Sequence, residues 1–405
     1  MNSTLVSGGL VFSYARSSGR STSVHIDTVL VALVAGILLL GLVMVASASM
    51  YRASKEVGDP FYYLEGQLLF AIIGIACAAF MMCVPTRLLE RAAIPLLILA
   101  VAALFLVLIP GIGGAANGAR RWLRVAGFNF QVSELARVFV LIYLASYAVR
   151  HKEELRETLS GLAKPLGLLA CLAALLLAEP DFGAAAVLFA VGFGLLFVAG
   201  ARLRYVIGMI VVAASAFAAL AWTSPYRKRR LLAFLNPWED PQDSGYQLTH
   251  SLIAIGRGEW LGVGLGESVQ KLFYLPEAHT DFLFAVLAEE LGLLGVIATL
   301  TLFALLVWRS FHIARMAVDS GLEFPGYLAA GFGLWLGVQA FVNIGVNMGV
   351  LPTKGLTLPL MSYGRSSLVV TLLWVGIVLR VWHETMNERR GAATVRRRAA
   401  AEDDE

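Results

Sequence analysis

The sequence predicts an all-α polytopic membrane protein, and its composition and the length of its apolar stretches carry this prediction. Of its 405 residues, 58% are hydrophobic and only 15% are charged, whereas soluble domains contain about 25% charged residues. The apolar residues gather in stretches of roughly 18–27 residues, a length that crosses a bilayer as a helix. The strands of a membrane β-barrel would instead be short and alternating. All three cysteines fall inside apolar stretches, so we expect no disulfide framework.

About ten such stretches occur, and each is interpreted as one transmembrane helix. The first has no small-residue cleavage site and is expected to stay in the protein as an anchor. Lys and Arg are more numerous on the N-terminal side of the predicted membrane, which places both termini in the cytoplasm. The predicted spans are 27–50, 62–84, 92–110, 131–149, 162–178, 181–200, 203–223, 280–308, 324–350 and 366–387.

These spans divide the chain into five parts. The tail is basic and polar, cannot build a core and is predicted to be disordered. The only sizeable segment outside the membrane is one large extracytoplasmic (periplasmic) loop between helices 7 and 8. The parts are a cytoplasmic N-terminal segment 1–26, helices 1–7 in 27–223, the loop 224–279, helices 8–10 in 280–387 and the cytoplasmic tail 388–405.

The large loop contains a glycine-rich stretch and a basic run. Gly262, Gly264 and Gly266 resemble a phosphate-binding loop only in spacing, because no Gly-Lys-Ser/Thr sequence follows, and a flexible turn is expected instead. The basic run Arg227–Arg230 has two open interpretations. It contacts anionic lipid headgroups, or its planar guanidinium groups recognise a phosphorylated or pyrophosphorylated ligand. The six histidines show no metal-binding spacing, so no metal site is predicted.

Polar side chains inside the predicted spans mark the interior of a helix bundle, because they do not face lipid. Glu134 and Arg137 are three residues apart on the fourth span and are expected to pair on one face. Gln339, Asn343 and Asn347 recur every fourth residue along the ninth span and form an amide stripe. This stripe either joins helices through hydrogen bonds or lines a wet cavity, and the sequence leaves both roles open.

The eighth span carries three acids, although a carboxylate at the centre of a membrane helix costs about 2.5–3.5 kcal/mol. The plain interpretation of the first acid is that Thr280 caps the helix and Asp281 stabilises its first turn. Helix geometry puts Glu289 and Glu290 deeper and on other faces, so the three acids cannot form one site. The two glutamates therefore need partners inside the bundle, such as an arginine or the amide stripe. Asp281 lies at the outer mouth and is the candidate for chemistry.

Three long segments are specific enough to indicate a family: SVQKLFYLPEAHTDF, NIGVNMGVLPTKGLTLPLMSYG and GARRWLRVAGFNFQVSELAR. They resemble the SEDS family (shape, elongation, division and sporulation), ten-span proteins that polymerise peptidoglycan in cell-wall biogenesis. The first segment is similar to the cell-division member of the family rather than to the elongation member. The resemblance implies a septal peptidoglycan glycosyltransferase that polymerises lipid II into glycan strands and releases undecaprenyl pyrophosphate.

The resemblance also implies roles for individual residues. Asp281, in the HTDF motif, is implied to be essential and catalytic. Arg365 departs from the family pattern, because it replaces the second glycine of a Tyr-Gly-Gly-Ser-Ser motif, and arginine cannot supply the backbone freedom of glycine. The candidates for substrate binding are Arg121, Glu134, Arg137, Glu277, His279, Lys354 of the PTKG motif and Ser366.

The implied reaction agrees with these residue types. The 4-hydroxyl of one disaccharide attacks the anomeric carbon of another, and such an inverting transfer needs one carboxylate, here Asp281, to accept the hydroxyl proton. The lipid pyrophosphate leaves unprotonated if cations neutralise it, and Arg121, Lys354 and Arg227–Arg230 are candidates for that task. The residues indicate no definite cofactor. A divalent cation, Mg²⁺ or Mn²⁺, is compatible with the chemistry, but the sequence shows no dedicated ligand cage.

By the same resemblance, the protein is expected in the bacterial cytoplasmic (inner) membrane at the division septum. Its implied partners are the substrate lipid II, a class B penicillin-binding protein transpeptidase and other divisome proteins, and no nucleic acid is expected. Two alternatives stay open. A lipid II flippase would use Glu134, Arg137 and the amide stripe as a polar path for the headgroup. A divisome scaffold would explain the tail and the loops but none of the buried charge.

Overall fold

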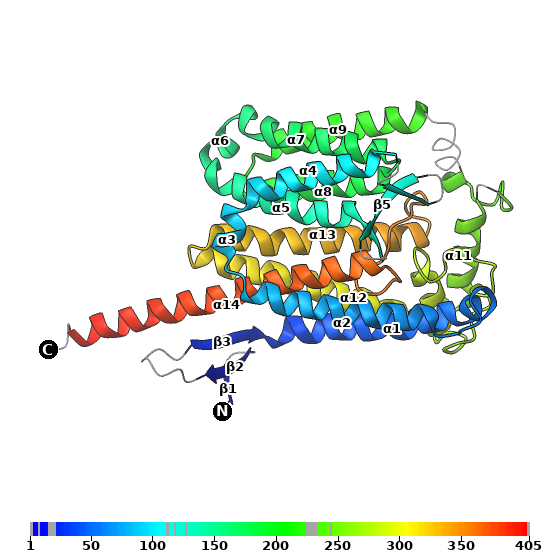
Figure 1. Ribbon diagram of the computed structural model, residues 1–405, viewed down its shortest axis with the longest axis horizontal. Coiled ribbons are helices and arrows are strands. Elements are labelled where there is room, and N and C mark those ends of the chain that lie inside the picture. The colour runs from blue at the N-terminus through cyan, green and yellow to red at the C-terminus, as the bar shows by residue number, and fades with distance from the viewer. Residues whose placement is uncertain are drawn as a thin grey trace.

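The computed structural model describes residues 3–6, 9–14, 22–110, 113–116, 119–125, 128–223, 233–243 and 245–402. Long helices lying side by side form its body, and both chain ends lie at one end of this bundle (Figure 1). The helices are α1 (Thr28–Glu56), α2 (Tyr62–Cys83), α3 (Thr86–Arg91), α4 (Ala93–Leu108), α5 (Val132–Arg150), α6 (Lys152–Glu157), α7 (Leu159–Ala178), α8 (Phe182–Val198), α9 (Leu203–Thr223), α11 (Tyr246–Arg257), α12 (Leu283–Asp319), α13 (Glu323–Asn347) and α14 (Arg365–Glu402).

Each predicted span overlaps one apolar helix, so the predominantly helical architecture is confirmed. Within the described residues, seven helices are long and apolar enough to cross a membrane, namely α1, α2, α5, α7, α12, α13 and α14. Three more apolar helices are shorter by the same measure, Ala93–Leu108, Phe182–Val198 and Leu203–Ala216. A helix that crosses a bilayer must have a minimum apolar length, so the lengths of the apolar stretches predicted the helices well.

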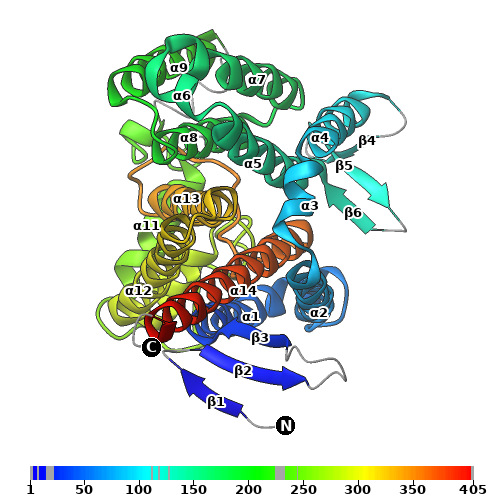
Figure 2. The same ribbon diagram turned by 90° about the vertical axis from the view of Figure 1, so that its left-hand side faces the viewer.

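Two small antiparallel sheets depart from the all-α prediction. The first joins β1 (Ser3–Val6), β2 (Gly9–Tyr14) and β3 (Thr22–Asp27), and the second joins β4 (Gly113–Ala116), β5 (Ala119–Val125) and β6 (Phe128–Gln131). The first lies beside α14 and the second beside α4 (Figure 2). Their strands are only four to seven residues long, too short to show a clear alternating pattern in the sequence.

The tail also differs from its prediction, since α14 continues as helix to Glu402. Residues 388–402 are rich in Ala, Arg and Glu, which are among the strongest helix formers, and the tail contains no proline. No residue of the tail therefore ends the helix of the last predicted span at the membrane surface. Its final turns project beyond the bundle (Figure 1).

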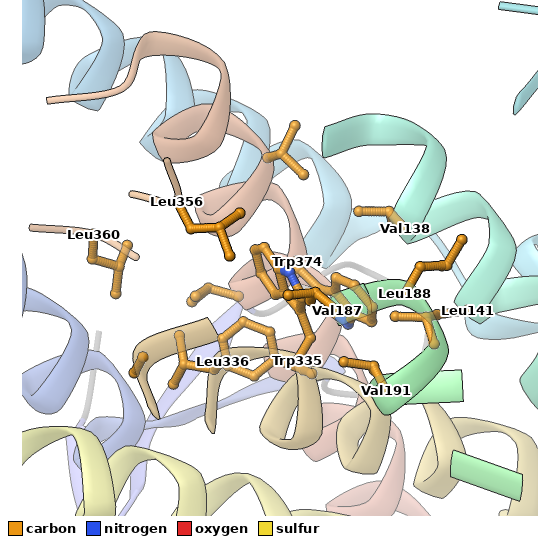
Figure 3. Close-up of a cluster of buried hydrophobic side chains, with 14 of the residues drawn as sticks. Val138, Leu141, Val187, Leu188, Val191, Trp335, Leu336, Leu356, Leu360 and Trp374 are labelled. Carbon is orange, nitrogen blue, oxygen red and sulfur yellow. The ribbon is translucent and has the colours of Figure 1, made fainter. Parts of the chain in front are cut away.

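A buried aromatic pair anchors the part of the chain that carries the PTKG motif. Trp335 of α13 and Trp374 of α14 stack with ring centroids 5.4 Å apart and are almost fully buried. Side chains of α5 and α8 pack around them, as do Leu356 and Leu360 from the connection between α13 and α14 (Figure 3). The connection 348–364, called here the α13–α14 loop, is thus fixed to the hydrophobic core.

The helix α12 is broken at Gly292, whose φ is 62° and ψ −162°. A break inside an apolar helix leaves backbone groups that lipid cannot satisfy. Here the segment 258–264 satisfies them: Val263 N–H donates to Glu289 O (3.0 Å), and Leu293 N–H donates to Glu259 O (2.9 Å). The backbones approach so closely that a Cβ on Gly262 would lie 2.1 Å from the backbone oxygen of Glu290. Gly262 and Gly264 are therefore part of a packed backbone brace, which the prediction of a flexible turn did not include, whereas Gly266 lies in open space.

Candidate active site

Asp281 lies in a turn that precedes α12 rather than in its first turn. The helix begins at Leu283, its N-cap position is Phe282, and no side chain caps it. The hydroxyl of Thr280 instead donates to the side chain and backbone oxygens of Glu277, at 2.8 and 3.2 Å. The capping interpretation of Thr280 and Asp281 is therefore wrong, and the position of Asp281 needs another explanation.

The amide stripe supplies that explanation. The side-chain amides of Asn343 and Asn347 both donate to the backbone oxygen of Asp281, at 2.9 and 3.0 Å. Asn347 also accepts a hydrogen bond from the backbone N–H of Ala285 (3.1 Å), and Asn343 donates to Leu356 O (2.5 Å) in the α13–α14 loop. These bonds hold Asp281 against α13 from both sides. Of the two roles left open by the sequence, the amide stripe therefore performs the joining role.

The carboxylate of Asp281 faces the PTKG motif. A Cβ placed on Gly355 would lie 3.0 Å from Asp281 Oδ2, so any larger residue there would crowd the carboxylate. The preceding residue, Lys354, has its ammonium group 4.1 Å from the ring centroid of Phe182, a cation–π distance. Two motifs more than seventy residues apart in the sequence thus meet at one place.

Glu134 and Arg137 form the expected buried ion pair, with Arg137 Nη2 2.5 Å from Glu134 Oε1. Arg137 also donates to the side-chain oxygen of Gln339 (3.1 Å), and Gln339 donates to Thr357 O (3.0 Å) in the α13–α14 loop. The second carboxylate oxygen of Glu134 and the hydroxyl of Ser133 are buried without a hydrogen-bond partner among the described residues. The pair therefore supports the α13–α14 loop and leaves unsatisfied acceptors beside it.

Arg121 lies on β5 and binds the turn between α7 and α8. Its guanidinium donates to the backbone oxygens of Glu179 (3.1 Å) and Pro180 (2.5 Å). Asp181, in the same turn, caps α8 by accepting from Ala184 N–H (3.0 Å). Sequence reasoning missed Glu179 and Asp181. The available signal was two acids around one proline at the junction of two apolar spans.

The carboxyl group of Glu179 is fully buried, and neither of its oxygens has a hydrogen-bond partner among the described residues. Burial and the neighbouring charge of Asp181 raise the pKa of this carboxyl to about 8, against the opposing effect of Arg121. Glu179 is therefore mostly a neutral acid at pH 7.

The matching family confirms the resemblance that the motifs suggest. A family model described as a cell cycle protein, built on FtsW, RodA and SpoVE, matches residues 27–387. The chain belongs to the FtsW/RodA/SpoVE family. Among its relatives, a probable peptidoglycan glycosyltransferase FtsW of Thioalkalivibrio sulfidiphilus is 52% identical, covering 92% of this chain and 94% of that protein. The corresponding protein of Methylococcus capsulatus is 50% identical over 91% of this chain and 94% of its own length.

Solved structures of the FtsW/RodA/SpoVE family share the fold. One, from a study of how a peptidoglycan synthase complex coordinates polymerisation and crosslinking, is 32% identical with a TM-score of 0.73 and covers 89% of this chain and 98% of its own. The rod shape determining protein RodA of Thermus thermophilus is 30% identical with a TM-score of 0.66, covering 89% of this chain and 97% of its own.

His279 and Glu277 lie on the other side of Asp281 and line a cavity of about 210 Å³ with Arg52, Glu56 and Lys271. His279 is buried between aromatic rings, 4.7 Å from that of Tyr63 by centroid, and desolvation lowers its pKa to about 4. His279 is therefore a neutral, packed side chain near neutral pH.

Ser366 and Arg365 begin α14, where the chain departs from the family pattern. Ser366 Oγ accepts a hydrogen bond from the backbone N–H of Gln131 (3.0 Å), so it ties α14 to the end of β6. Arg365 is half-buried, donates to the hydroxyl of Tyr363 (2.9 Å) and lies over the ring of Phe70. Both side chains have structural partners in this arrangement.

The two remaining acids of the eighth span stabilise the segment 257–271 and are not candidates for the chemistry. Glu289 pairs with Arg257 (3.1 Å), and Glu290 pairs with Lys271 (2.8 Å), both at the buried side of the segment 257–271. An arginine partner was expected for one of them and is found, whereas the amide stripe contacts neither among the described residues. The basic run Arg227–Arg230 lies outside the described residues. No group of three metal-ligating side chains occurs in the part of the chain that the structure describes.

Proposed function

We propose that this protein is a septal peptidoglycan glycosyltransferase that polymerises lipid II into glycan strands during cell division. The relatives that carry the name probable peptidoglycan glycosyltransferase FtsW match nearly the full chain at about half identity. The observation that carries the proposal is the meeting of the Asp281 carboxylate with Gly355, next to Lys354. A fixed acid beside a cation is what a glycosyl transfer to a hydroxyl, with loss of a pyrophosphate, requires.

In the proposed mechanism Asp281 is the general base. It accepts the proton of the attacking 4-hydroxyl as the new bond to the anomeric carbon forms and the bond from that carbon to the pyrophosphate oxygen breaks. The electron pair of the broken bond leaves with undecaprenyl pyrophosphate, and the configuration inverts. Arg121 and Lys354 neutralise the departing charge, while Asn343 and Asn347 keep the base in place through its backbone oxygen.

The topology in the membrane forms part of the proposal. Ten spans, both termini in the cytoplasm and an extracytoplasmic segment 224–279 put Asp281 on the outer side of the inner membrane at the septum. The common location of the two chain ends at one end of the bundle supports it (Figure 1). The likeness to a chain of a peptidoglycan synthase complex supports a transpeptidase partner, a class B penicillin-binding protein. Other divisome proteins are the remaining proposed partners.

The flippase alternative is less well supported by the contacts of its polar residues. A translocation path needs side chains that can exchange partners with a passing headgroup. Gln339, Asn343 and Asn347 instead bond to backbone atoms of the α13–α14 loop and of Asp281. A scaffold alone gives no reason for the buried Glu134–Arg137 pair.

Purified protein supplied with lipid II tests the proposal. We expect glycan strands from the protein together with its transpeptidase partner, with the transpeptidase active site blocked so that strands remain uncrosslinked. Absence of strands under these conditions, from protein shown to be folded, would overturn the proposed activity. Transfer of lipid II across vesicles without any strand formation would favour the flippase.

A further inference from the structure

Arg121 keeps its positive charge uncompensated in this structure. Its guanidinium donates to the backbone oxygens of Glu179 and Pro180, and neither acceptor is a carboxylate. Among the described residues no ion pair joins Arg121 to an acid. Backbone carbonyls orient a guanidinium without cancelling its charge, so the charge stays available to an anion.

Glu179 provides the second observation, because its own carboxyl group does not pair with the nearby arginine. Both oxygens are buried without a hydrogen-bond partner, although Arg121 binds the backbone of the same residue. An ionised carboxylate in such a place would be expected to bind the arginine, since an unpaired buried charge is very costly. The arrangement fits a carboxyl group that carries its proton, and its pKa, raised to about 8, agrees.

We propose that Glu179 is a positioning residue whose protonation controls whether Arg121 can bind the pyrophosphate of the substrate. With a neutral Glu179, the guanidinium rests on the turn carbonyls and offers its remaining N–H groups to phosphate oxygens. When Glu179 loses its proton, the carboxylate competes for Arg121 and cancels its charge. This inference rests on the proposed function, since lipid II supplies the pyrophosphate.

The charged groups around Glu179 allow this competition. Arg121 of β5 and Asp181 of the same turn act on it most directly. Glu134 and Arg137 of α5 are paired with each other, and Glu134 also interacts electrostatically with Asp181. Asp181 is committed to capping α8. Arg121 is thus the cation whose partner changes when Glu179 ionises.

The pH dependence of the Michaelis constant for lipid II tests whether the protonation of Glu179 controls pyrophosphate binding by Arg121. Strand synthesis by the full chain with its partner is followed between pH 6.5 and 9.5. Loss of one proton near pH 8 should raise KM about tenfold between pH 7 and pH 9, with little change in kcat. Glu179→Gln, which is neutral throughout, should keep its pH 7 value of KM at pH 9. Glu157→Gln, an exposed residue at the end of α6 next to the start of α7, serves as the matched control and should follow the wild type.

A second variant keeps the test decisive if Glu179→Gln folds poorly. Asp181→Asn retains an N-cap side chain but removes the charge that raises the pKa of Glu179, so the rise in KM should begin at lower pH. Identical pH profiles for the wild type, Glu179→Gln and Asp181→Asn would overturn the inference and leave the proposed function intact. A wild type that makes no strands at any pH would contradict the proposed function itself.

Discussion

Near the chain termini the buried Asp27 is fully bonded, whereas several buried oxygens at the opposite end of the bundle have no hydrogen-bond partner among the described residues. Asp27 caps α1 through the N–H groups of Val29 and Leu30, at 3.0 and 3.1 Å, and pairs with Arg309 at 2.8 Å. The guanidinium of Arg309 also lies over the ring of Trp382. Both carboxylate oxygens of Asp27 are thus bonded within the fold.

The opposite end of the bundle differs, because buried oxygens without a hydrogen-bond partner occur among its described residues. These side-chain oxygens occur on Ser133, Glu134, Glu179, Asn343 and Ser367, which lie at the start of α5, just after α7, near the end of α13 and at the start of α14. A native fold tolerates few such groups, and a functional site is one of the reasons for them. The Asp27–Arg309 pair therefore serves stability, and the unpartnered oxygens at the other end are compatible with the substrate site proposed above.

The largest expected effect on stability comes from the bonded end. Arg309→Ala leaves Asp27 buried without its cation and should lower the free energy of unfolding by about 3–5 kcal/mol. Strand synthesis per folded molecule should remain within a few-fold of the wild type. Thermal unfolding in detergent measures the first quantity. The double variant Asp27→Asn/Arg309→Met is the control, and if it is no more stable than Arg309→Ala, the pair is not what stabilises this end.

Arg137→Ala should affect both stability and activity, because this arginine links Glu134 to Gln339 and through it to the α13–α14 loop. We expect a similar loss of about 3–5 kcal/mol from the unpaired carboxylate. In addition, strand synthesis by the folded fraction should fall at least tenfold. Normal activity in the folded fraction would show that the pair does not support the site.

Acid should weaken the packing around His279. Its pKa is lowered to about 4, so the unfolded chain binds a proton more readily than the folded one between pH 6.5 and pH 4. The stability that His279 contributes is therefore complete above pH 6.5 and is lost as the pH falls through this window. His279→Gln should show a shallower decrease of melting temperature with acid. The buried His25, whose pKa is similarly lowered, is present in both proteins and cancels in the comparison.

The smallest effect is expected at the departure from the family pattern. Arg365 donates a hydrogen bond to Tyr363 and lies over the ring of Phe70, so its side chain already has partners in the fold. Arg365→Gly should leave strand synthesis within a few-fold and change stability by about 1 kcal/mol. A change in activity of more than tenfold in either direction would show that Arg365 tunes the site.

Apolar length was enough to predict the helices, but it could not show what happens between them. The break at Gly292 and its glycine-rich brace depend on backbone bonds between segments about thirty residues apart, and no local pattern reveals such bonds. The motifs led to Asp281 and Lys354 through the family resemblance. The hold of Asn343 on the Asp281 backbone, and the buried carboxyl of Glu179, became visible only when the helices were assembled.

The central claim is that Asp281 acts as the base, and one paired measurement tests it most directly. Wild type and Asp281→Asn are prepared identically, and strand synthesis from lipid II and melting temperature are measured on each. Asparagine keeps the size of the side chain and the backbone oxygen that Asn343 and Asn347 bind, so the melting temperature should be unchanged. Synthesis should fall by about 100-fold or more, because a general base contributes that much to the rate. Strand synthesis by Asp281→Asn at a rate near that of the wild type would contradict the account.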